Sequence, residues 1–223
     1  MDREIRLTKG KDPADVLDYK EPITKIYLVR HGETKANVHN LLFGHLDWDL
    51  NKTGRQQAEK TAKKLQLLTK KGDIKCIITS PLRRAKSTSK IIGKKLKIKK
   101  IIINKDLIEK SEGVWEGMNY WQARKQDPIN YKRWIKNPFY IRPPKGESIE
   151  ELRIRVNRFY KNILKKYPGQ SIIVVSHSGP IKMLVLIALK MHITKFWYLK
   201  AECASITELH LSKKHAMLWG LNK

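Results

Sequence analysis

Short apolar runs alternate with longer amphipathic stretches from residue 25 to the end of the chain. The short, mostly apolar runs predict strands at 25–29, 76–79, 101–104, 172–175, 204–211 and 216–221. Apolar residues at helical spacing predict helices over 54–71, 82–96, 120–135, 147–166 and 180–189. This alternation indicates an α/β protein, a three-layer α/β/α sandwich built on a mainly parallel sheet.

The first 22 residues differ in composition from the rest of the chain. They are charged throughout and are interrupted by Gly10 and Pro13, and no stretch among them resembles an apolar secretory leader. We therefore expect residues 1–22 to be an N-terminal extension and residues 23–223 to be one domain.

Cysteine usage and hydropathy indicate a cytoplasmic protein. The two cysteines, Cys76 and Cys203, form no CxxC pair, which fits a reducing compartment. The longest near-apolar run, 181–189, is too short to span a bilayer and contains Lys182, so it predicts a buried helix. We expect no membrane partner.

The chain is strongly basic. Lys and Arg total 47 against 21 acidic residues, a formal net charge of +26, and 35 of the 47 basic residues are lysine. Such a surface attracts anions, including phosphorylated metabolites and nucleic acid. Because the lysines lie on nearly every predicted helix and arginine is scarce, a solvated surface is favoured over a nucleic-acid interface.

Chemically reactive residues follow three of the predicted strands. The strand at 25–29 runs into Arg30 and His31, the strand at 172–175 into His177, and the strand at 76–79 into Arg83 and Arg84. Parallel strands end at one edge of a sheet, so these side chains are expected to meet there. Imidazole and guanidinium groups together predict a pocket for a multiply charged anion such as phosphate.

Five motifs in a set order carry a family resemblance. They are Arg30-His31-Gly32-Glu33-Thr34 followed by Asn37 and Gly44, Ser80-x-Leu82-x-Arg84-Ala85, Leu107-x-Glu109-x-x-x-Gly113, Pro144-x-Gly146-Glu147-Ser148 and Val175-Ser176-His177-x-Gly179. Together they resemble the histidine phosphatase superfamily, which includes the cofactor-dependent phosphoglycerate mutases, over residues 25–210. One departure is Ser178, which stands where a glycine often follows the second histidine.

The resemblance implies a phosphoglycerate mutase-like fold and a phosphohistidine intermediate. His31 is then the nucleophile and Glu109 the proton donor and acceptor. The groups implied around the phosphate are Arg30, Arg84 and His177, and further phosphate or substrate contacts are expected from Asn37, Thr34, Gly44 and Ser178. Positive neighbours disfavour the imidazolium form, so we expect His31 to be neutral near pH 7. The same charges neutralise the phosphate, so no metal ion and no cofactor are expected.

Some assignments near these motifs have alternatives. Glu116 competes with Glu109 as the acid, although the motif spacing favours Glu109. Arg83 is either a surface residue or a second phosphate contact. His39 and His45 have no cysteine or carboxylate partner at ligand spacing, so a loop role is favoured over a metal site.

Aromatic residues gather between the acid motif and Gly146. Tyr120, Trp121 and Trp134 belong to this group. Either they pack a helix on the core, or they form a lid over the leaving group of the substrate, where the resemblance places an insertion that determines specificity.

The expected activity is metal-independent hydrolysis of a small phosphorylated metabolite, with α-ribazole phosphate or a broad range of substrates favoured. The interval between Glu109 and Ser148 is short for a phosphoglycerate mutase, which is the first alternative. The second is a catalytically silent module that binds phosphate or nucleic acid. Nucleic acid is not the favoured partner, and a homodimer is left open.

Overall fold

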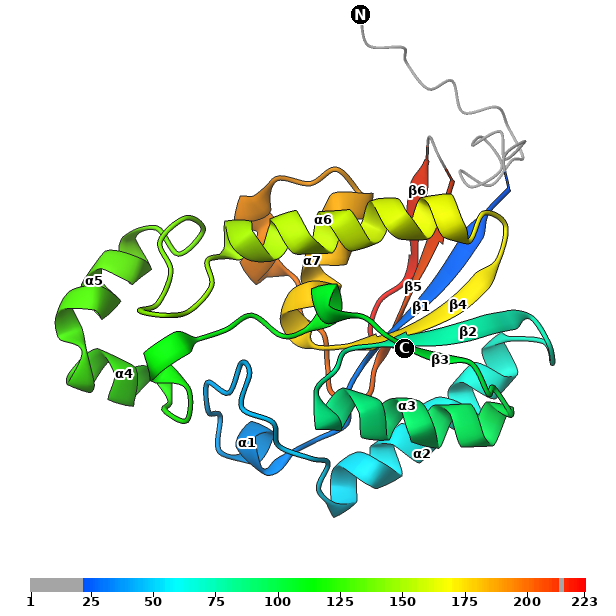
Figure 1. The fold of residues 1–223 in the computed structure, drawn as a ribbon, viewed down its shortest axis with the longest axis horizontal. Coiled ribbons are helices and arrows are strands. Elements are labelled where there is room, and N and C mark those ends of the chain that lie inside the picture. Colours follow the sequence, from blue (N-terminus) through cyan, green and yellow to red (C-terminus); the bar gives the residue numbers. More distant parts are fainter. Residues whose placement is uncertain (1–21, 213–214) are drawn as a thin grey trace, which may run out of the picture.

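The computed structural model describes residues 22–212 and 215–223 (Figure 1). The predicted extension therefore lies outside the described residues, apart from Pro22. Six strands of the described chain form one sheet in the order β3-β2-β4-β1-β5-β6. They are β1 (Thr24–Arg30), β2 (Ile74–Thr79), β3 (Ile101–Ile103), β4 (Ser171–Ser176), β5 (Ile206–Leu211) and β6 (Ala216–Gly220).

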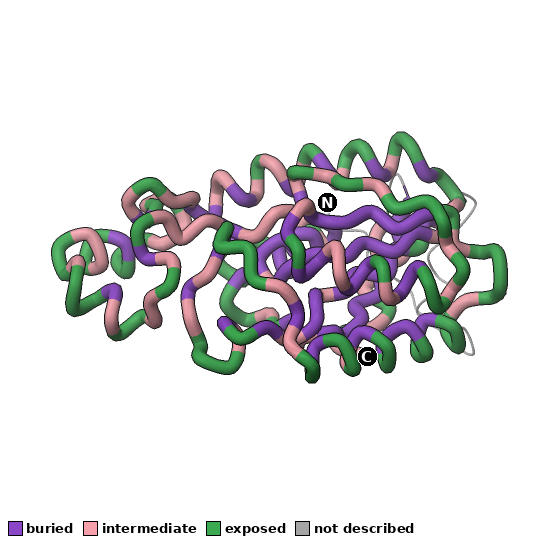
Figure 2. Tube along the Cα trace, turned by 60° about the horizontal axis from the view of Figure 1, so that its bottom comes forward, coloured by how far each residue is buried: buried purple, intermediate pink, exposed green. Residues whose placement is uncertain are grey.

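The sheet is mainly parallel, as predicted. β1, β2, β3 and β4 run in one direction, β5 pairs antiparallel with β1, and β6 pairs antiparallel with β5. The central strands β1 and β4 are buried on both faces, and Figure 2 shows strands as the most continuously buried segments. Burial on both faces explains why their sequences are nearly continuous apolar runs.

Helices cover both faces of the sheet, which confirms the three-layer sandwich (Figure 1). On one face, α2 (Lys52–Leu68) and α3 (Arg83–Leu96) pack on Tyr27 and Val29 of β1. On the other face, α6 (Ile149–Lys166) and α7 (Ser178–Ala188) pack on Ile26 and Leu28. Successive strand residues point to opposite faces, so one strand serves both cores.

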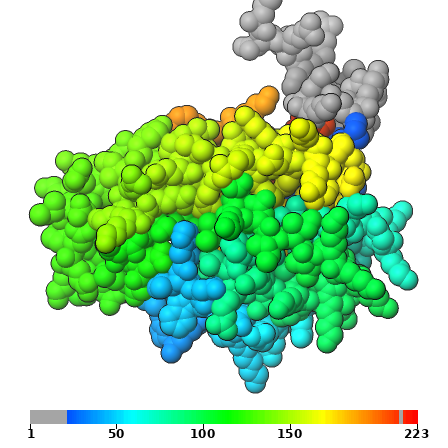
Figure 3. Space-filling model, viewed as in Figure 1, coloured from blue at the N-terminus to red at the C-terminus, as the bar shows by residue number. Residues whose placement is uncertain are grey.

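One predicted helix is wrong. The stretch 120–135 forms two helices, α4 (Tyr120–Gln126) and α5 (Pro128–Lys136). Asp127 ends the first and caps the second, and its side chain accepts a hydrogen bond from the Asn130 amide. Pro128 has no amide hydrogen to continue α4 but suits the first position of a new helix, so the break falls there. Figure 3 shows the residues of α4 and α5 at one end of the molecule.

Short helical elements lie in the loops at the carboxyl edge of the sheet. They are α1 (Lys35–Val38), η2 (Lys105–Leu107), η3 (Gly113–Trp115) and η4 (Ile193–Tyr198). Among the described residues, every helix is too short or too polar to cross a bilayer.

Candidate active site

Three strand ends bring reactive side chains to one edge of the sheet. The neighbouring parallel strands β1, β4 and β2 end immediately before His31, His177 and Ser80. The ring centroids of His31 and His177 lie 5.1 Å apart. The structure thus brings together the two histidines that the sequence places after separate strands.

His31 has a defined protonation state. Its side chain is buried, and Nδ1 lies 2.7 Å from the carbonyl oxygen of Gly32. A carbonyl only accepts, so Nδ1 carries the proton and Nε2 keeps its lone pair. Burial, with added repulsion from Arg30 and Arg84, holds the pKa of His31 well below its ordinary value of 6.5. The ring is a neutral imidazole with an electron pair on Nε2, as a nitrogen nucleophile requires.

His177 is held in the opposite tautomer. Arg84 Nε donates to His177 Nδ1 over 3.2 Å, so the ring proton lies on Nε2, which donates to Ser80 Oγ over 2.7 Å. Burial and then the charge of Arg84 keep the pKa of His177 well below 6.5. Counting His177 with Arg30 and Arg84 among the positive neighbours of His31 is therefore wrong, because a proton on His177 Nδ1 would face the N–H of the Arg84 guanidinium.

Arg84 is completely buried and ties a loop to the site. Its Nη2 and Nη1 atoms donate to the carbonyl oxygens of Gly44 and Leu46, both over 2.8 Å. Burial lowers the pKa of Arg84 to about 10, so the side chain stays charged at neutral pH. The three bonds to protein leave two of the five guanidinium N–H groups for a phosphate oxygen.

Arg30 has a donor without a protein acceptor. Its Nη1 donates to the Ala201 carbonyl over 2.7 Å, whereas Nε is buried with no hydrogen-bond partner among the described residues. A buried unpaired N–H is costly, and most such groups in proteins are paired. An anion bound beside His31 would satisfy it.

Glu109 lies at the amino end of α7. Its carboxylate accepts from the Gly179 amide over 3.1 Å and from the Lys110 amide over 2.8 Å. A Cβ atom on Gly179 would overlap Glu109 Oε1, so only glycine allows this approach. The Gly179 amide that binds the Glu109 carboxylate is two residues after His177, so the carboxylate lies at the same edge of the sheet as the histidines.

Arg155 anchors the segment that carries Glu109. Its guanidinium pairs with Glu147 over 2.7 Å and donates to the backbone carbonyls of Ile108 over 2.7 Å and Glu109 over 3.1 Å. Sequence reasoning missed this role, although Glu147 belongs to a recognised motif. No sequence signal connects it to Arg155, because the two meet across a helix end.

Glu116 has a different task from Glu109. Its carboxylate accepts from the backbone amides of His45, Leu46 and Glu112 over 2.9–3.1 Å. These three amides and Ser111 Oγ bind the Glu116 carboxylate into the loop that holds Arg84, whereas the Glu109 carboxylate accepts from two amides. The geometry thus favours Glu109 as the acid, in line with the motif spacing.

The predicted binding residues divide into two groups. Thr34 and Asn37 form a capping box in which Asn37 Oδ1 accepts from Thr34, so that within the described part of the chain the Asn37 amino group is left for another acceptor. Gly44 contributes its carbonyl to Arg84. Ser178 is the first residue of α7, a position where backbone amides favour anions. Thr34 and Gly44 thus shape the loop, whereas Asn37 and Ser178 carry available donors.

Arg83 and His39 are exposed, whereas His45 contacts the backbone of Glu109. Arg83 is exposed, and its amide donates to Asp47 over 2.6 Å. His39 is exposed, and His45 Nε2 lies 3.0 Å from the Glu109 carbonyl oxygen. Across the described chain, no group of three or more His, Cys, Asp or Glu side chains has a metal-binding arrangement.

The aromatic group forms a small core of its own. Trp134 is buried against Trp115 and Tyr131, with ring centroids 5.5 Å from each, and Tyr120 stacks on it at 5.9 Å. Trp121, in contrast, is 67% exposed. Trp134 is thus a packing residue, whereas Trp121 and, at 43% exposed, Tyr120 keep surface exposed to solvent.

The aromatic core is joined to the loop of the site. Leu42 belongs to the core, and its amide donates to the Met118 carbonyl over 2.7 Å while its carbonyl accepts from Gly117. The next residue, Phe43, packs edge-on against His31 and beneath the guanidinium of Arg84. Sequence reasoning missed Phe43, since an apolar residue in a loop gives no signal of its own.

Comparison with known proteins is consistent with this geometry. Residues 26–223 match the family model of the histidine phosphatase superfamily, branch 1. The chain is 31% identical to a bifunctional protein of Mycobacterium tuberculosis over 88% of its own length and 56% of that protein's length. It therefore spans little more than half of that relative.

Two further relatives match over nearly their whole length. Phosphoserine phosphatase 1 of Hydrogenobacter thermophilus is 29% identical, over 90% of this chain and 92% of that protein. The crystal structure of the α-ribazole phosphatase of Shigella flexneri has a TM-score of 0.80 and 27% identity, over 89% of this chain and 96% of that one.

Proposed function

The chain belongs to the histidine phosphatase superfamily, and from this we propose that it hydrolyses a small phosphomonoester through a phosphorylated His31. The observation that carries the proposal is the tautomer of His31. Its Nδ1 proton is held by the Gly32 carbonyl, and its Nε2 lone pair belongs to a buried neutral ring beside two arginines.

In the first step His31 Nε2 attacks the phosphorus atom. The N–P bond forms as the bond between phosphorus and the ester oxygen breaks, and Glu109, in its protonated form, gives a proton to the departing oxygen. The products are the free alcohol and phosphohistidine. The hydrogen bond from Nδ1 to Gly32 keeps the ring oriented as Nε2 becomes bonded.

In the second step water attacks the phosphorus atom. Glu109, now a carboxylate, takes a proton from the water as the new P–O bond forms. The N–P bond then breaks, and its electron pair returns to Nε2. The step releases inorganic phosphate and restores both His31 and protonated Glu109.

Arg30 and Arg84 stabilise the charge of the transferring phosphoryl group. The buried Nε of Arg30 and the two remaining N–H groups of Arg84 are the donors proposed to bind its oxygens. The Asn37 amino group and the Ser178 amide are proposed to complete the contacts. With these groups supplying the positive charge, we propose that the reaction needs no metal ion.

The substrate is proposed from the relatives and remains to be measured. α-Ribazole phosphate, the choice favoured from the sequence, agrees with the name of one structural relative, and phosphoserine with that of one sequence relative. Both are small phosphomonoesters. A panel that contains these two, sugar phosphates and 3-phosphoglycerate will rank them.

The test is phosphate release from p-nitrophenyl phosphate and this panel, with EDTA present. His31→Ala is compared with His39→Ala, since His39 is an exposed histidine of a nearby loop. We expect His31→Ala to lose activity by at least about 10³-fold, as expected for loss of a nucleophile, and His39→Ala to keep it.

Trapping completes the test. Acid-labile phosphate on the wild-type protein, absent from His31→Ala, is expected after rapid quenching. Activity that depends on added metal would overturn metal independence. Transfer of phosphate between phosphoglycerates without net hydrolysis would favour the mutase, and no turnover of any ester would favour a binding module.

A further inference from the structure

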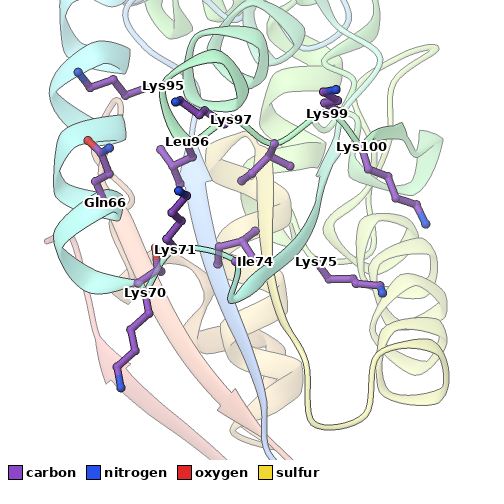
Figure 4. Close-up of a pocket in the computed structure, with 13 residues that line it drawn as sticks. Gln66, Lys70, Lys71, Ile74, Lys75, Lys95, Leu96, Lys97, Lys99 and Lys100 are labelled. Atoms are coloured by element: carbon purple, nitrogen blue, oxygen red, sulfur yellow. The ribbon is translucent and has the colours of Figure 1, made fainter.

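A second basic region lies at the opposite end of the sheet from the histidines. A cleft of about 780 Å³ is formed by the last residues of α2 and α3 and by the turns that lead into β2 and β3 (Figure 4). His31 and His177 follow the carboxyl ends of their strands, whereas this cleft includes the start of β2. The length of β2 therefore separates the two regions, about 20 Å for six residues.

Lysines line most of the cleft. They are Lys70, Lys71, Lys75, Lys95, Lys97, Lys99 and Lys100, all exposed. The lining contains no carboxylate, and within the described chain none of these ammonium groups forms an ion pair. In Figure 4, Lys71 extends toward Leu96, whereas Lys75 and Lys100 extend away from Leu96, and Ile74 lies between Lys71 and Lys75.

Helix dipoles explain only part of this arrangement. Lysine at the carboxyl end of a helix is stabilised by the partial negative charge there, which accounts for Lys95 near the end of α3. Lys75 is in β2, and Lys99 and Lys100 precede β3, where no helix dipole favours them. One carboxylate, that of Asp73, lies in the turn before β2 and accepts from the Lys70 amide over 3.0 Å. The lysines outnumber it, so the region keeps an excess of positive charge that a multiply charged anion would offset.

The chemistry of the lining indicates the class of anion. Lysine binds phosphate as a point charge, and no arginine is present for planar, bidentate recognition of a base or a carboxylate. No aromatic residue is present on which bases of a single strand could stack. Ile74, Leu96 and Ile98 offer apolar surface for the lysine stems.

The size of the cleft favours a compact ligand. Its volume falls in the range of pockets for small molecules and cofactors. We propose that this cleft binds a compact polyphosphate, a small molecule with three or more linked phosphate groups, at a site separate from the catalytic centre. The proposal does not depend on the phosphatase mechanism.

The test is calorimetric titration of the full chain with inorganic tripolyphosphate, and with orthophosphate for comparison. The cleft variant carries Lys71→Gln, Lys75→Gln and Lys100→Gln. The matched control carries Lys132→Gln, Lys136→Gln and Lys161→Gln, which removes the same charge from exposed positions on α5 and α6. Circular dichroism and Tm verify that both variants are folded.

We expect tripolyphosphate to bind more tightly than orthophosphate and to bind the cleft variant at least about tenfold more weakly, with less than about a twofold change in the control. The affinity of His31→Ala should equal that of the wild type. Equal losses in the two lysine variants would show a general effect of net charge and overturn the proposal. Loss of binding in His31→Ala would place the ligand in the catalytic centre instead. Tight binding of a mixed-sequence oligonucleotide without binding of tripolyphosphate would also overturn it.

Discussion

His31 and His177 lie with ring centroids 5.1 Å apart and hold their protons on different nitrogens. His31 donates from Nδ1 to Gly32, and His177 donates from Nε2 to Ser80. His31 Nε2 therefore keeps its lone pair, and the lone pair of His177 Nδ1 accepts a hydrogen bond from Arg84 Nε. Each ring is thus fixed as a neutral group by a partner of its own.

This arrangement predicts acid sensitivity of the fold. Both histidines have pKa values well below 6.5, so below pH 6.5 the unfolded chain binds protons that the folded chain does not. The free energy of unfolding should therefore fall with decreasing pH, by up to about 1.4 kcal/mol per pH unit for each histidine. Urea unfolding at pH 7 and pH 5 measures this slope. His31→Asn should reduce it and His39→Asn should not; an unchanged slope in His31→Asn would contradict the assignment.

Glu109 should matter most for poor leaving groups. Glu109→Gln cannot protonate the departing oxygen, so hydrolysis of an alkyl phosphate should slow by about 10²–10⁴-fold. Formation of phosphohistidine from p-nitrophenyl phosphate should slow much less, because p-nitrophenolate leaves without a proton. Gly179→Ala should show the same pattern, since a Cβ there displaces the carboxylate. Rapid-quench measurement with both substrates checks this, and equal losses for the two would argue against proton transfer by Glu109.

Arg84→Lys should be far from conservative. A lysine cannot bond Gly44, Leu46 and His177 at once, so the loop and the tautomer of His177 both lose their support. We expect a fall in kcat/KM of at least about 10²-fold and faster hydrogen exchange at the amides of residues 43–47. The adjacent Arg83→Lys is the control because Arg83 is exposed. Similar behaviour of the two variants would show that the hydrogen bonds of Arg84 are dispensable.

Much of this site could be predicted from the chain, and the reasons are physical. His31 and His177 follow apolar runs that parallel pairing brings to one edge, so their proximity follows from local patterns. Arg84 donates to carbonyls of the 43–47 loop, and Glu116 accepts from amides of the same loop. The path of this loop has no helical or strand periodicity, so these contacts could not be predicted. Pro128 is a helix-breaking residue, but the apolar spacing continues on both sides of it and therefore predicts one helix where the structure has two.

The buried and the exposed tryptophan of the aromatic group should respond differently to mutation. Trp134→Ala removes a buried ring from the small core and should lower the free energy of unfolding by about 3–5 kcal/mol if that core unfolds with the domain. Trp121→Ala should leave stability unchanged, since the ring is mostly exposed, and should raise KM for large substrates if α4 covers the leaving group. Thermal unfolding and the substrate panel separate the two effects. A KM that stays constant for every substrate in Trp121→Ala would exclude the lid.

Lys182 should make the fold less stable at neutral pH than a neutral replacement does, and this difference should shrink in alkali. The residue is 9% exposed, and its ammonium lies 4.0 Å from the ring centroid of Phe196 and 5.0 Å from that of Trp197. Burial lowers the pKa of Lys182 from 10.5 to about 8. Below pH 8 burial of the charged ammonium lowers the free energy of unfolding by about 3 kcal/mol. Between about pH 8 and pH 10.5 the folded chain releases this proton while the unfolded chain keeps it. The free energy of unfolding therefore recovers over this range. Lys182→Met, which retains the apolar stem, should therefore exceed the wild type in stability at pH 7, and the difference should shrink as the pH rises through that window. Urea unfolding of both proteins across the window measures the difference, in which the titration of tyrosines and cysteines common to both cancels. A difference that does not change with pH would mean that Lys182 keeps an ordinary pKa in the folded protein.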